Sequence, residues 1–496
     1  MLPDKSVLST LKIWLSISIV LHIITSILSI GYHQGDEHFQ ILEFAGLKIG
    51  FNAPENLAWE FHYQMRPAIQ PFFAVLAIKA FDFFSLTDPF IQTILFRMIS
   101  SILSLVSMVA FILAFIDDFD NAVLKKWFIT TSLLLWCLLY IDVRFSSEGW
   151  SASFLVLGVA MLRWYLDKNV EQNKIYYLIL TGFIIGLSFV CRYQTGTFII
   201  GLALWLFFIK KETFKTFSSL FIGAIAAVVI GIWIDYWFYG KITLTAFNYF
   251  TQNILENKVS NYGVSPWWYY FSDVIENGYV FFGVLCVFSF LILLLRNPKN
   301  IFVWSILPFI HIHSLIGHKE SRFLFPILKF APYIVLFSFV LLSRYKKIID
   351  LILSRQSFVF FMSINAVLIV ASCFTPAEYY IGVIRHIEYT YEEPIHFYYT
   401  DNNNPYENYG LFNHFYNKKR VIWEKIDTLS KMKIEKNRTT LLITTNKKKL
   451  DNVTDLRFCK IYQPFPEFLT ENLTGWASRH TFPIIYSCEK KPTIVQ

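Results

Sequence analysis

An acidic pair beyond the first apolar run of the chain could act as a general base. Asp36 and Glu37 stand in the motif GDEHFQ, directly after that run. Burial beside an apolar surface raises the pKa of a carboxyl group, which suits it to take a proton from a hydroxyl nucleophile. If the segment is helical, Gln40 and Glu43 lie on the same face as Asp36, so an amide would orient the base. The alternative is that Asp36 only caps the helix by accepting hydrogen bonds from its first N–H groups.

A second motif, GHKESRF, concentrates charge between two later apolar runs. It contains four ionisable side chains within five residues: His318, Lys319, Glu320 and Arg322. An arginine offers a planar fork to phosphate oxygens, a lysine offers a point charge, and a histidine can donate a proton to a leaving oxygen. These residue types together predict an anion site that suits a phosphate. The alternative is that the basic residues set the topology of the chain or reach from the bilayer to its interface.

Three further basic residues lie near apolar runs. Arg192 has no obvious partner close in sequence, and we predict that it is an additional phosphate ligand. Arg144 precedes Glu148 by four residues, which predicts a structural ion pair. Lys329 follows Arg322 by seven residues on the same helical face, about 10 Å deeper. It either extends the cationic track into the membrane or pairs with an acid, and the sequence leaves both open.

The composition indicates which elements position these residues. Of the 496 residues, 55% are hydrophobic and only 16% are charged, which excludes a water-soluble globule. The apolar residues form runs of membrane-spanning length, so the chain is predicted to be an all-α polytopic membrane protein. The net charge of +8 comes from basic residues that stand singly or in small groups between these runs. Their placement indicates a role in topology and excludes nucleic acid as a partner.

The apolar runs predict about eleven transmembrane helices. They cover residues 11–30, 90–115, 127–143, 149–166, 176–193, 195–209, 216–235, 276–295, 300–315, 322–343 and 357–375. Alternate loops are rich in lysine and arginine and face the cytoplasm by the positive-inside rule. The acidic pair, Arg192, GHKESRF and an aromatic loop then lie on the opposite face. Because ionisable groups at membrane depth are costly unless they pair or face water, we expect them to line one cavity.

Two outer loops and a tail complete the predicted layout. Residues 1–375 form the transmembrane catalytic domain. Within it, residues 31–89 form a first outer loop with helices on the membrane surface or, alternatively, a further pair of spans. Residues 236–275 form a second large outer loop. Residues 376–496 lack a spanning run and form a small mixed α/β domain outside the cytoplasm.

The tail carries local patterns of both kinds of secondary structure. Residues 420–432 are helix-like and residues 439–446 are strand-like. Cys459 and Cys488 both lie in this tail, and we predict that they form a disulfide because an exported domain meets an oxidising environment.

Signatures of metal and nucleotide binding are absent from the sequence. It contains no CxxC pair, no HExxH and no glycine-rich phosphate loop. We therefore predict no metal and no cofactor, and a soluble nucleotide-sugar donor is disfavoured. The aromatic pair Trp267 and Trp268 belongs either to an interfacial belt or to a surface that contacts a sugar or a lipid.

Five motifs occur in order over residues 31–330. They are GDEHFQ, Arg66 followed by proline, DYWFYG with Asn248 after it, YGVSPWW beginning at Tyr262, and GHKESRF. Together they resemble the membrane mannosyltransferases of glycosyltransferase family 22, which includes enzymes of GPI-anchor assembly and of late N-glycan assembly. The resemblance implies the GT-C fold.

The resemblance also implies a reaction. Mannose would move from a polyprenyl-phosphate mannose, dolichyl or undecaprenyl, to a hydroxyl of a lipid-linked glycan. The reaction would invert the anomeric centre without a metal, on the outer face of a bacterial inner membrane or in the ER lumen. The first acidic position of the family falls on Asp36, with Glu37 beside it, so Asp36 is the expected base.

The resemblance extends the expected site to the donor phosphate and the substrates. HKE-x-RF falls on the donor-phosphate ligands His318, Lys319 and Arg322, which Arg192 would join. The expected substrate contacts are Gln40, Arg66, Asn248, Tyr262, Trp267, Trp268 and Glu320.

Other functions fit parts of the sequence. A GT-C transferase of another polyprenyl-linked sugar would use the same groups. A secondary transporter or lipid flippase would instead place ionisable groups near the midplane and often shows repeated halves, neither of which the sequence indicates. A membrane scaffold without catalysis is a third alternative.

Overall fold

The computed structural model describes residues 5–167, 174–342, 351–392, 395–400, 403–408, 410–417, 421–434, 439–445, 456–463 and 483–490. The chain divides into two compact units that alternate along the sequence. The first unit comprises Met1–Ile27, Trp59–Leu76 and Ile94–Phe374. The second unit comprises Leu28–Ala58, Ala77–Thr93 and Thr375–Gln496.

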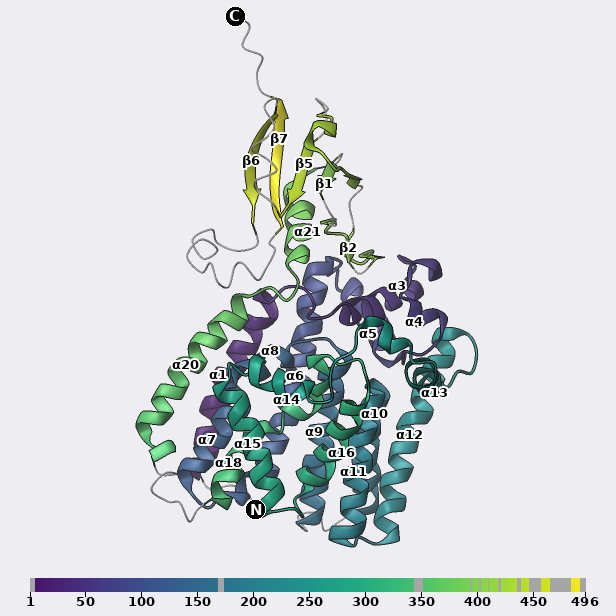
Figure 1. Cartoon of the computed structure of the whole chain (residues 1–496). Helices are drawn as coiled ribbons and strands as arrows, with labels where there is room; N and C mark the ends of the chain where they lie inside the picture. Colours follow the sequence, from purple (N-terminus) through teal and green to yellow (C-terminus); the bar gives the residue numbers. More distant parts are fainter. Residues whose placement is uncertain are drawn as a thin grey trace, which may run out of the picture. The chain divides into compact units, whose positions relative to one another are not determined.

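The first unit is built from helices (Figure 1). Its longer helices are α1 (Lys5–Leu28), α6 (Pro89–Phe115), α7 (Ala122–Leu134), α9 (Ser147–Leu166), α10 (Lys174–Cys191), α12 (Phe214–Tyr239), α15 (Phe281–Arg296), α16 (Ile301–Leu315), α18 (Ala331–Leu341) and α20 (Arg355–Phe374). Its shorter helices are α4 (Trp59–His62), α8 (Trp136–Asp142), α11 (Gly196–Trp205), α13 (Thr245–Phe250), α14 (Tyr269–Asn277) and α17 (Phe325–Leu328). Helix α5 (Ile69–Phe83) follows α4.

Helices occupy all the predicted apolar runs, but the count of eleven spans is not confirmed. Among the described residues, 7 helices are long and apolar enough to cross a membrane, or up to 9 if each bent pair is one span. The bent pairs are Ala122–Leu134 with Trp136–Asp142 and Ser321–Leu328 with Ala331–Leu341. The other two predicted spans are α15, with 16 residues, and α16, with 15. At 1.5 Å per residue each is shorter than the hydrocarbon core, which is about 30 Å thick.

The break between α7 and α8 is stabilised by one side chain of α20. Asn365 accepts a hydrogen bond from the backbone N–H of Trp136 at 3.1 Å and donates one to the carbonyl of Leu134 at 2.7 Å. These are the backbone groups that the break releases from the helix. The side-chain amide of Asn365 therefore supplies the two hydrogen bonds that the broken helix cannot make in the apolar interior.

Glycines allow α10 and α12 to pack backbone against backbone. A Cβ atom on Gly182 would lie 2.0 Å from the carbonyl oxygen of Leu220, and one on Gly223 would lie 1.9 Å from that of Ile179. Small residues at such spacings permit the close approach of membrane helices. The packing fixes α10, whose C-terminal end leads into Arg192.

The second unit begins with short helices. Helix α2 (Gly35–Glu37) runs through a π-turn (His38–Leu42) into α3 (Glu43–Ile49). With α4 and α5, they confirm helices in the predicted first outer loop, and none of the four is a candidate span. Their placement on a membrane surface stays a prediction.

The C-terminal part of the second unit holds helix α21 (Tyr379–Thr390) and a small sheet. The strands are β1 (Ile395–Tyr399), β4 (Val421–Lys425), β5 (Thr439–Thr444), β6 (Leu456–Tyr462) and β7 (Ile484–Lys490), with β2 (Glu407–Asn408) and β3 (Leu411–Phe412) in a separate pair. The order in the sheet is β4-β1-β5-β7-β6. Strand β1 is parallel to both β4 and β5, whereas β7 is antiparallel to β5 and β6.

Two predictions for this tail are wrong and one is confirmed. The strand predicted at residues 439–446 is β5. Within the helix predicted at 420–432, Val421–Lys425 forms β4 and Leu429–Lys431 forms a 3-10 turn, because parallel pairing with β1 overrides the local helical pattern. The cysteines are free: Cys459 is exposed and Cys488 is buried. Cys488 pairs in register with Phe458, the residue before Cys459, so the two thiols point to opposite faces of the sheet.

Candidate functional site: a buried arginine and glutamate cluster

A buried acid stands at the N-terminal end of α9. Ser146 caps this helix by accepting a hydrogen bond from the backbone N–H of Gly149 at 3.0 Å. Glu148 lies in the first turn, where the free N–H groups and the helix dipole favour negative charge. Its side chain is only 2% exposed. A carboxylate buried so deeply requires positive partners.

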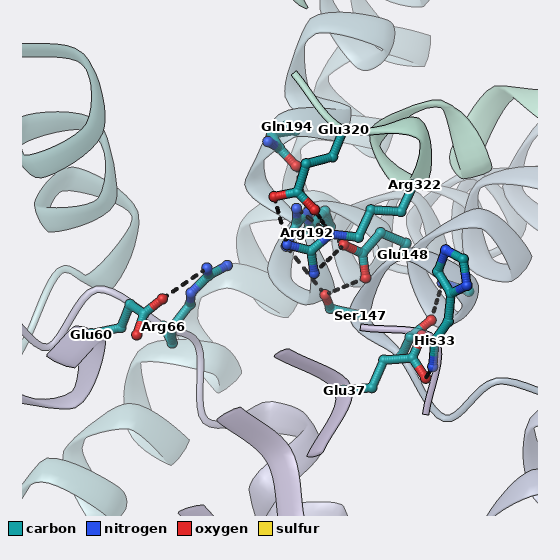
Figure 2. A network of polar contacts seen from close by, with 12 residues as sticks. His33, Glu37, Glu60, Arg66, Ser147, Glu148, Arg192, Gln194, Glu320 and Arg322 are labelled. Atoms are coloured by element: carbon teal, nitrogen blue, oxygen red, sulfur yellow. Dashed lines mark hydrogen bonds and ion pairs between the residues drawn. The ribbon is translucent and has the colours of Figure 1, made fainter. Parts of the chain in front are cut away.

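Two arginines from other helices contact this acid. The guanidinium of Arg192, which follows α10, lies 3.1 Å from Oε1 of Glu148. The guanidinium of Arg322, which precedes α17, lies 3.4 Å from the same oxygen. Arg322 also donates to both carboxylate oxygens of Glu320, at 2.6 and 3.0 Å. Figure 2 shows the two guanidinium groups and the two carboxylates pointing toward one another.

Neutral groups hold the two guanidinium groups in place. Arg192 donates to the side-chain oxygens of Gln194 and Ser147. The ring of Phe323 lies 5.2 Å from the guanidinium carbon of Arg192 and 5.5 Å from that of Arg322. An aromatic face attracts a cation, so Phe323 favours both positive charges at once. The cluster of Arg192, Arg322, Glu148 and Glu320, called the arginine cluster below, thus presents two planar forks around one shared acid.

The other two basic residues of GHKESRF hold the loop. Nζ of Lys319 donates to three backbone carbonyls, those of Ser265, Ile316 and Gly317. An ammonium has three N–H donors, so these contacts occupy all of them. Burial lowers the pKa of Lys319. Its predicted role as a phosphate ligand would require it to exchange carbonyls for phosphate oxygens, and that role stays a prediction.

His318 lies between a carboxylate and a carbonyl. Its Nε2 is 2.9 Å from Oε1 of Glu320, and its Nδ1 is 3.2 Å from the carbonyl oxygen of Gly263. Both neighbours are acceptors, so the doubly protonated ring satisfies both and a neutral ring satisfies one. The structure therefore gives His318 the geometry of a residue that orients Glu320.

Arg66 and Asn248, predicted as substrate contacts, lie around one segment of the first unit. Arg66 pairs with Glu60 at 3.4 Å, as Figure 2 shows, and lies 5.6 Å from the centroid of the Tyr249 ring. The amide of Asn248 donates to the carbonyl of Gln64 at 3.1 Å. Asn248 therefore fixes the backbone that presents Arg66.

The predicted aromatic contacts are exposed. Tyr262, Trp267 and Trp268 are 59%, 63% and 52% exposed. Tyr262 stacks on Trp59, with centroids 6.2 Å apart, and its ring lies 6.0 Å from that of His318. The two tryptophans meet edge to face. Their exposure fits both an interfacial belt and a substrate surface.

The acidic pair belongs to the second unit, and the expected helical face is wrong. The π-turn inserts an extra residue, so His38 and Glu43, five residues apart, meet at 2.8 Å. Glu43 also accepts from Asn52 and from the backbone N–H of Phe415, which makes it a structural acid. Gln40 is buried. The alignment of its amide with Asp36 stays a prediction.

Asp36 and Glu37 differ in burial. Asp36 is half-buried, whereas Glu37 is buried and accepts a hydrogen bond from the backbone N–H of His33 at 3.0 Å (Figure 2). The cap of α2 is Gln34 rather than Asp36. The alternative that Asp36 is the N-cap residue is therefore wrong, and its role as general base stays a prediction.

Glu148 has partners that its local sequence does not predict, and Lys329 takes one of its two expected roles. Spacing along the chain pairs Glu148 with Arg144, but the two arginines of the cluster contact it from distant segments of the chain. Arg144 is buried and lies over the ring of Tyr140. Lys329 pairs with an acid, Asp142, at 2.9 Å. One sequence feature could have indicated a special role for Glu148: it is an acid at the capped N-terminal end of a predicted span.

Metal ligands do not gather in the part of the chain that the structure describes. There, no group of three or more His, Cys, Asp or Glu residues could hold a metal ion. The predicted independence from metals and cofactors stays a prediction.

Sequence comparison decides the family. The sequence model of the Alg9-like mannosyltransferase family, glycosyltransferase family 22, matches residues 13–416, which is most of the chain. The chain belongs to this family. The match covers every residue of the arginine cluster and also Asp36, so the resemblance of the five motifs is confirmed.

Relatives within the family are distant. GPI mannosyltransferase 3 of Candida albicans is 28% identical over 298 residues, which cover 60% of this chain and 57% of that protein. GPI alpha-1,2-mannosyltransferase 3 of Homo sapiens is 23% identical over 321 residues, which cover 63% and 54%. The chain thus spans just over half the length of these relatives.

Solved structures of two other membrane proteins are similar to this member of the family. ArnT from Cupriavidus metallidurans bound to undecaprenyl phosphate has a TM-score of 0.49 at 9% identity, covering 96% of this chain and 97% of that one. The oligosaccharyltransferase of Archaeoglobus fulgidus has a TM-score of 0.46 at 13% identity, covering 82% and 62%.

Proposed function

We propose that this chain is an inverting GT-C mannosyltransferase that moves mannose from a polyprenyl-phosphate mannose to a hydroxyl of a lipid-linked glycan. One observation carries the proposal: two buried arginines, Arg192 and Arg322, share one acid, Glu148. Membership of the mannosyltransferase family supports the sugar. The undecaprenyl phosphate bound to ArnT and the GPI pathway names of the relatives indicate the chemical class of both substrates.

The arginine cluster supports a role at the leaving phosphate. As the bond between the sugar and the phosphate breaks, negative charge develops on the departing oxygen. Guanidinium groups that are already in place in a water-poor site stabilise this charge without reorganisation. Before the donor binds, Glu148 and Glu320 hold the forks in position. A phosphate would then take over some of the N–H donors, because an arginine offers five.

Asp36 is proposed as the general base toward the acceptor hydroxyl. An inverting displacement needs one base on the acceptor and no carboxylate nucleophile. Asp36 is less buried than Glu37, which suits a group that must meet a substrate. No metal or cofactor is needed in this scheme.

The test is transfer by the purified full chain in lipid nanodiscs. Polyprenyl-phosphate mannose is supplied with a panel of lipid-linked glycan acceptors, and products are resolved by mass spectrometry. We expect a mannosylated product, and we expect Asp36→Asn to lower kcat by about 10³-fold with unchanged melting temperature. Glu37→Gln tests the neighbouring acid, and a loss of kcat in this variant alone would make Glu37 the base. Polyprenyl-linked glucose and aminoarabinose are supplied in parallel reactions, and transfer from these donors alone would reject mannose as the transferred sugar. Wild-type turnover by Asp36→Asn would show that another residue is the base.

The site is proposed to face away from the cytoplasm, in the periplasm or the ER lumen. The basic loops between the apolar helices support this orientation. Single cysteines at Tyr262 and at Lys125 provide the check with a membrane-impermeant thiol reagent on intact vesicles. Labelling at Tyr262 from the cytoplasmic side would reverse the proposed topology, and labelling from both sides would favour a transporter.

A further inference from the structure

A second charged group lies deeper in the first unit and is not used by the proposed reaction. Lys329 is fully buried at the bend between α17 and α18. Its ammonium lies 2.9 Å from Oδ1 of Asp142 and donates to the hydroxyls of Ser104 and Ser153, at 2.6 and 2.9 Å. These three contacts match the three N–H donors of an ammonium. A buried charge with complete partners is costly to disturb.

The partners of Lys329 connect it to both halves of the arginine cluster. Asp142 ends α8, six residues before Glu148. Ser153 lies on α9, and its hydroxyl donates to the carbonyl of Gly149, the residue after Glu148, at 2.9 Å. Lys329 itself stands seven residues after Arg322. One ammonium thus ties the segment that carries Glu148 to the segment that carries Arg322.

A histidine extends the group toward α1. Nδ1 of His22 lies 2.7 Å from the carbonyl oxygen of Ser18, which can only accept, so Nδ1 carries a proton. Its Nε2 lies 3.6 Å from Oδ2 of Asp142. At this distance the two atoms form no hydrogen bond, so His22 borders Asp142 while the ion pair with Lys329 holds the acid.

We propose that Lys329 and Asp142 are positioning residues for the arginine cluster. Their ion pair sets the separation of the two segments, and so the distance at which Arg322 meets Glu148. The kinetic part of this inference rests on the proposed function, because it needs a measurable transfer. The structural part does not rest on the proposed function, because it concerns how rigidly two segments of the protein are held.

The test compares Lys329→Met and Asp142→Asn with a matched variant, Asp118→Asn. Asp118 also pairs with a basic residue of α9, Arg163 at 2.6 Å, but near the C-terminal end of that helix. Hydrogen exchange of the full chain in nanodiscs is measured in peptides that cover residues 143–150 and 317–325. We expect both peptides to exchange about tenfold faster in the first two variants and to be unchanged in Asp118→Asn. Unchanged exchange in all three would overturn the inference whatever the reaction.

A double-mutant cycle provides the kinetic arm. We expect Lys329→Met to lower kcat/KM for the donor about 100-fold in the wild-type background, since a misplacement of about 1 Å costs that much. In an Arg322→Ala background the same change should cost less than about threefold, because the group it positions is gone. Equal losses in both backgrounds would indicate general destabilisation and would overturn the positioning role.

A charge-free variant guards against misfolding. Removing one partner of a buried pair leaves an uncompensated charge, whereas Asp142→Leu with Lys329→Met removes both charges and is expected to fold. This variant should regain the melting temperature of the wild type and keep the fast exchange. If it regains wild-type exchange and turnover, the pair does not position the cluster. Faster exchange in a protein that transfers no mannose would reject the proposed function and leave the positioning inference standing.

Discussion

The two ends of helix α9 carry charged clusters that differ in burial and in the number of arginines. At the N-terminal end, two arginines share Glu148, and the three side chains are at most 8% exposed. At the C-terminal end, one arginine, Arg163, faces two acids, Asp118 at 2.6 Å and Asp167 at 2.8 Å. Those side chains are 17% to 39% exposed. One helix thus joins a cluster of two arginines and two acids, three of them deeply buried, to a more exposed cluster of one arginine and two acids.

The difference supports the proposed role of the arginine cluster in binding and a structural role for the other cluster. Asp167 caps the C-terminal end of α9, and Arg163 compensates its charge close to solvent, where an ion pair contributes little to stability. Arg192, Arg322 and Glu148 lack such access to water, so burying their charges costs free energy, whereas Glu320 is 23% exposed. Burial at this cost supports the proposed anionic ligand.

Removal of one arginine from each cluster should give the largest contrast. We expect Arg322→Ala to lower kcat/KM for the polyprenyl-phosphate sugar by about 10² to 10³-fold, because it removes a preorganised donor to the leaving phosphate. Arg163→Ala should change it less than about threefold. Steady-state kinetics with a varied donor provide the measurement. Arg322→Lys, which keeps the charge and loses the fork, should recover only part of the loss. Comparable losses at both ends of α9 would abolish the contrast.

Neutralising the acid of each cluster should give the next effect, on stability. Glu148→Gln leaves two buried guanidinium groups facing each other and is expected to cost about 3 kcal/mol. Asp118→Asn should cost about 1 kcal/mol or less, because its ionic partner Arg163 is 29% exposed and the amide oxygen can still accept from the hydroxyl of Tyr333. Thermal unfolding in detergent, without donor, compares the two. A smaller loss of melting temperature for Glu148→Gln than for Asp118→Asn would mean that the arginines do not depend on their shared acid.

The contrast also shows what the sequence could predict. Burial in lipid requires long apolar runs, so local patterns predict the helices. The family motifs are also local in the sequence. The partners of Glu148 come from distant segments of the chain. Local spacing predicts only Arg144, four residues away, as a partner. Long-range partners are set by packing, such as the glycine contacts of α10 with α12.

Local patterns also failed where tertiary structure overrides them. The π-turn at His38–Leu42 shifts the face that a regular helix would present. Strand β4 pairs with β1 although its sequence is helix-like. Both failures lie in the second unit, which holds the acidic pair. For the arginine cluster, in the first unit, the sequence predicts the residue types but not the contacts between them.

The smallest expected effect concerns the support of Arg322 and depends on pH. The carboxylate of Asp273, on α14, accepts hydrogen bonds from the hydroxyl of Ser321 at 2.6 Å and from Asn277 at 2.9 Å. Burial raises the pKa of Asp273 above its ordinary value of 3.8. The folded protein therefore binds the proton more tightly than the unfolded chain does, and Asp273 stabilises less as the pH rises from 3.8 through the raised pKa.

Asp273→Asn removes this dependence and keeps an acceptor for Ser321. Relative to this variant, the wild type should lose about 1 to 2 °C in melting temperature between pH 4 and pH 7. Asp427, whose side chain is 79% exposed, gives the control. Asp427→Asn should show no such trend. If the melting temperature of the wild type instead rises relative to Asp273→Asn across this range, the partners of Asp273 stabilise its charged form, and Ser321 donates to an ionised acid near the arginine cluster.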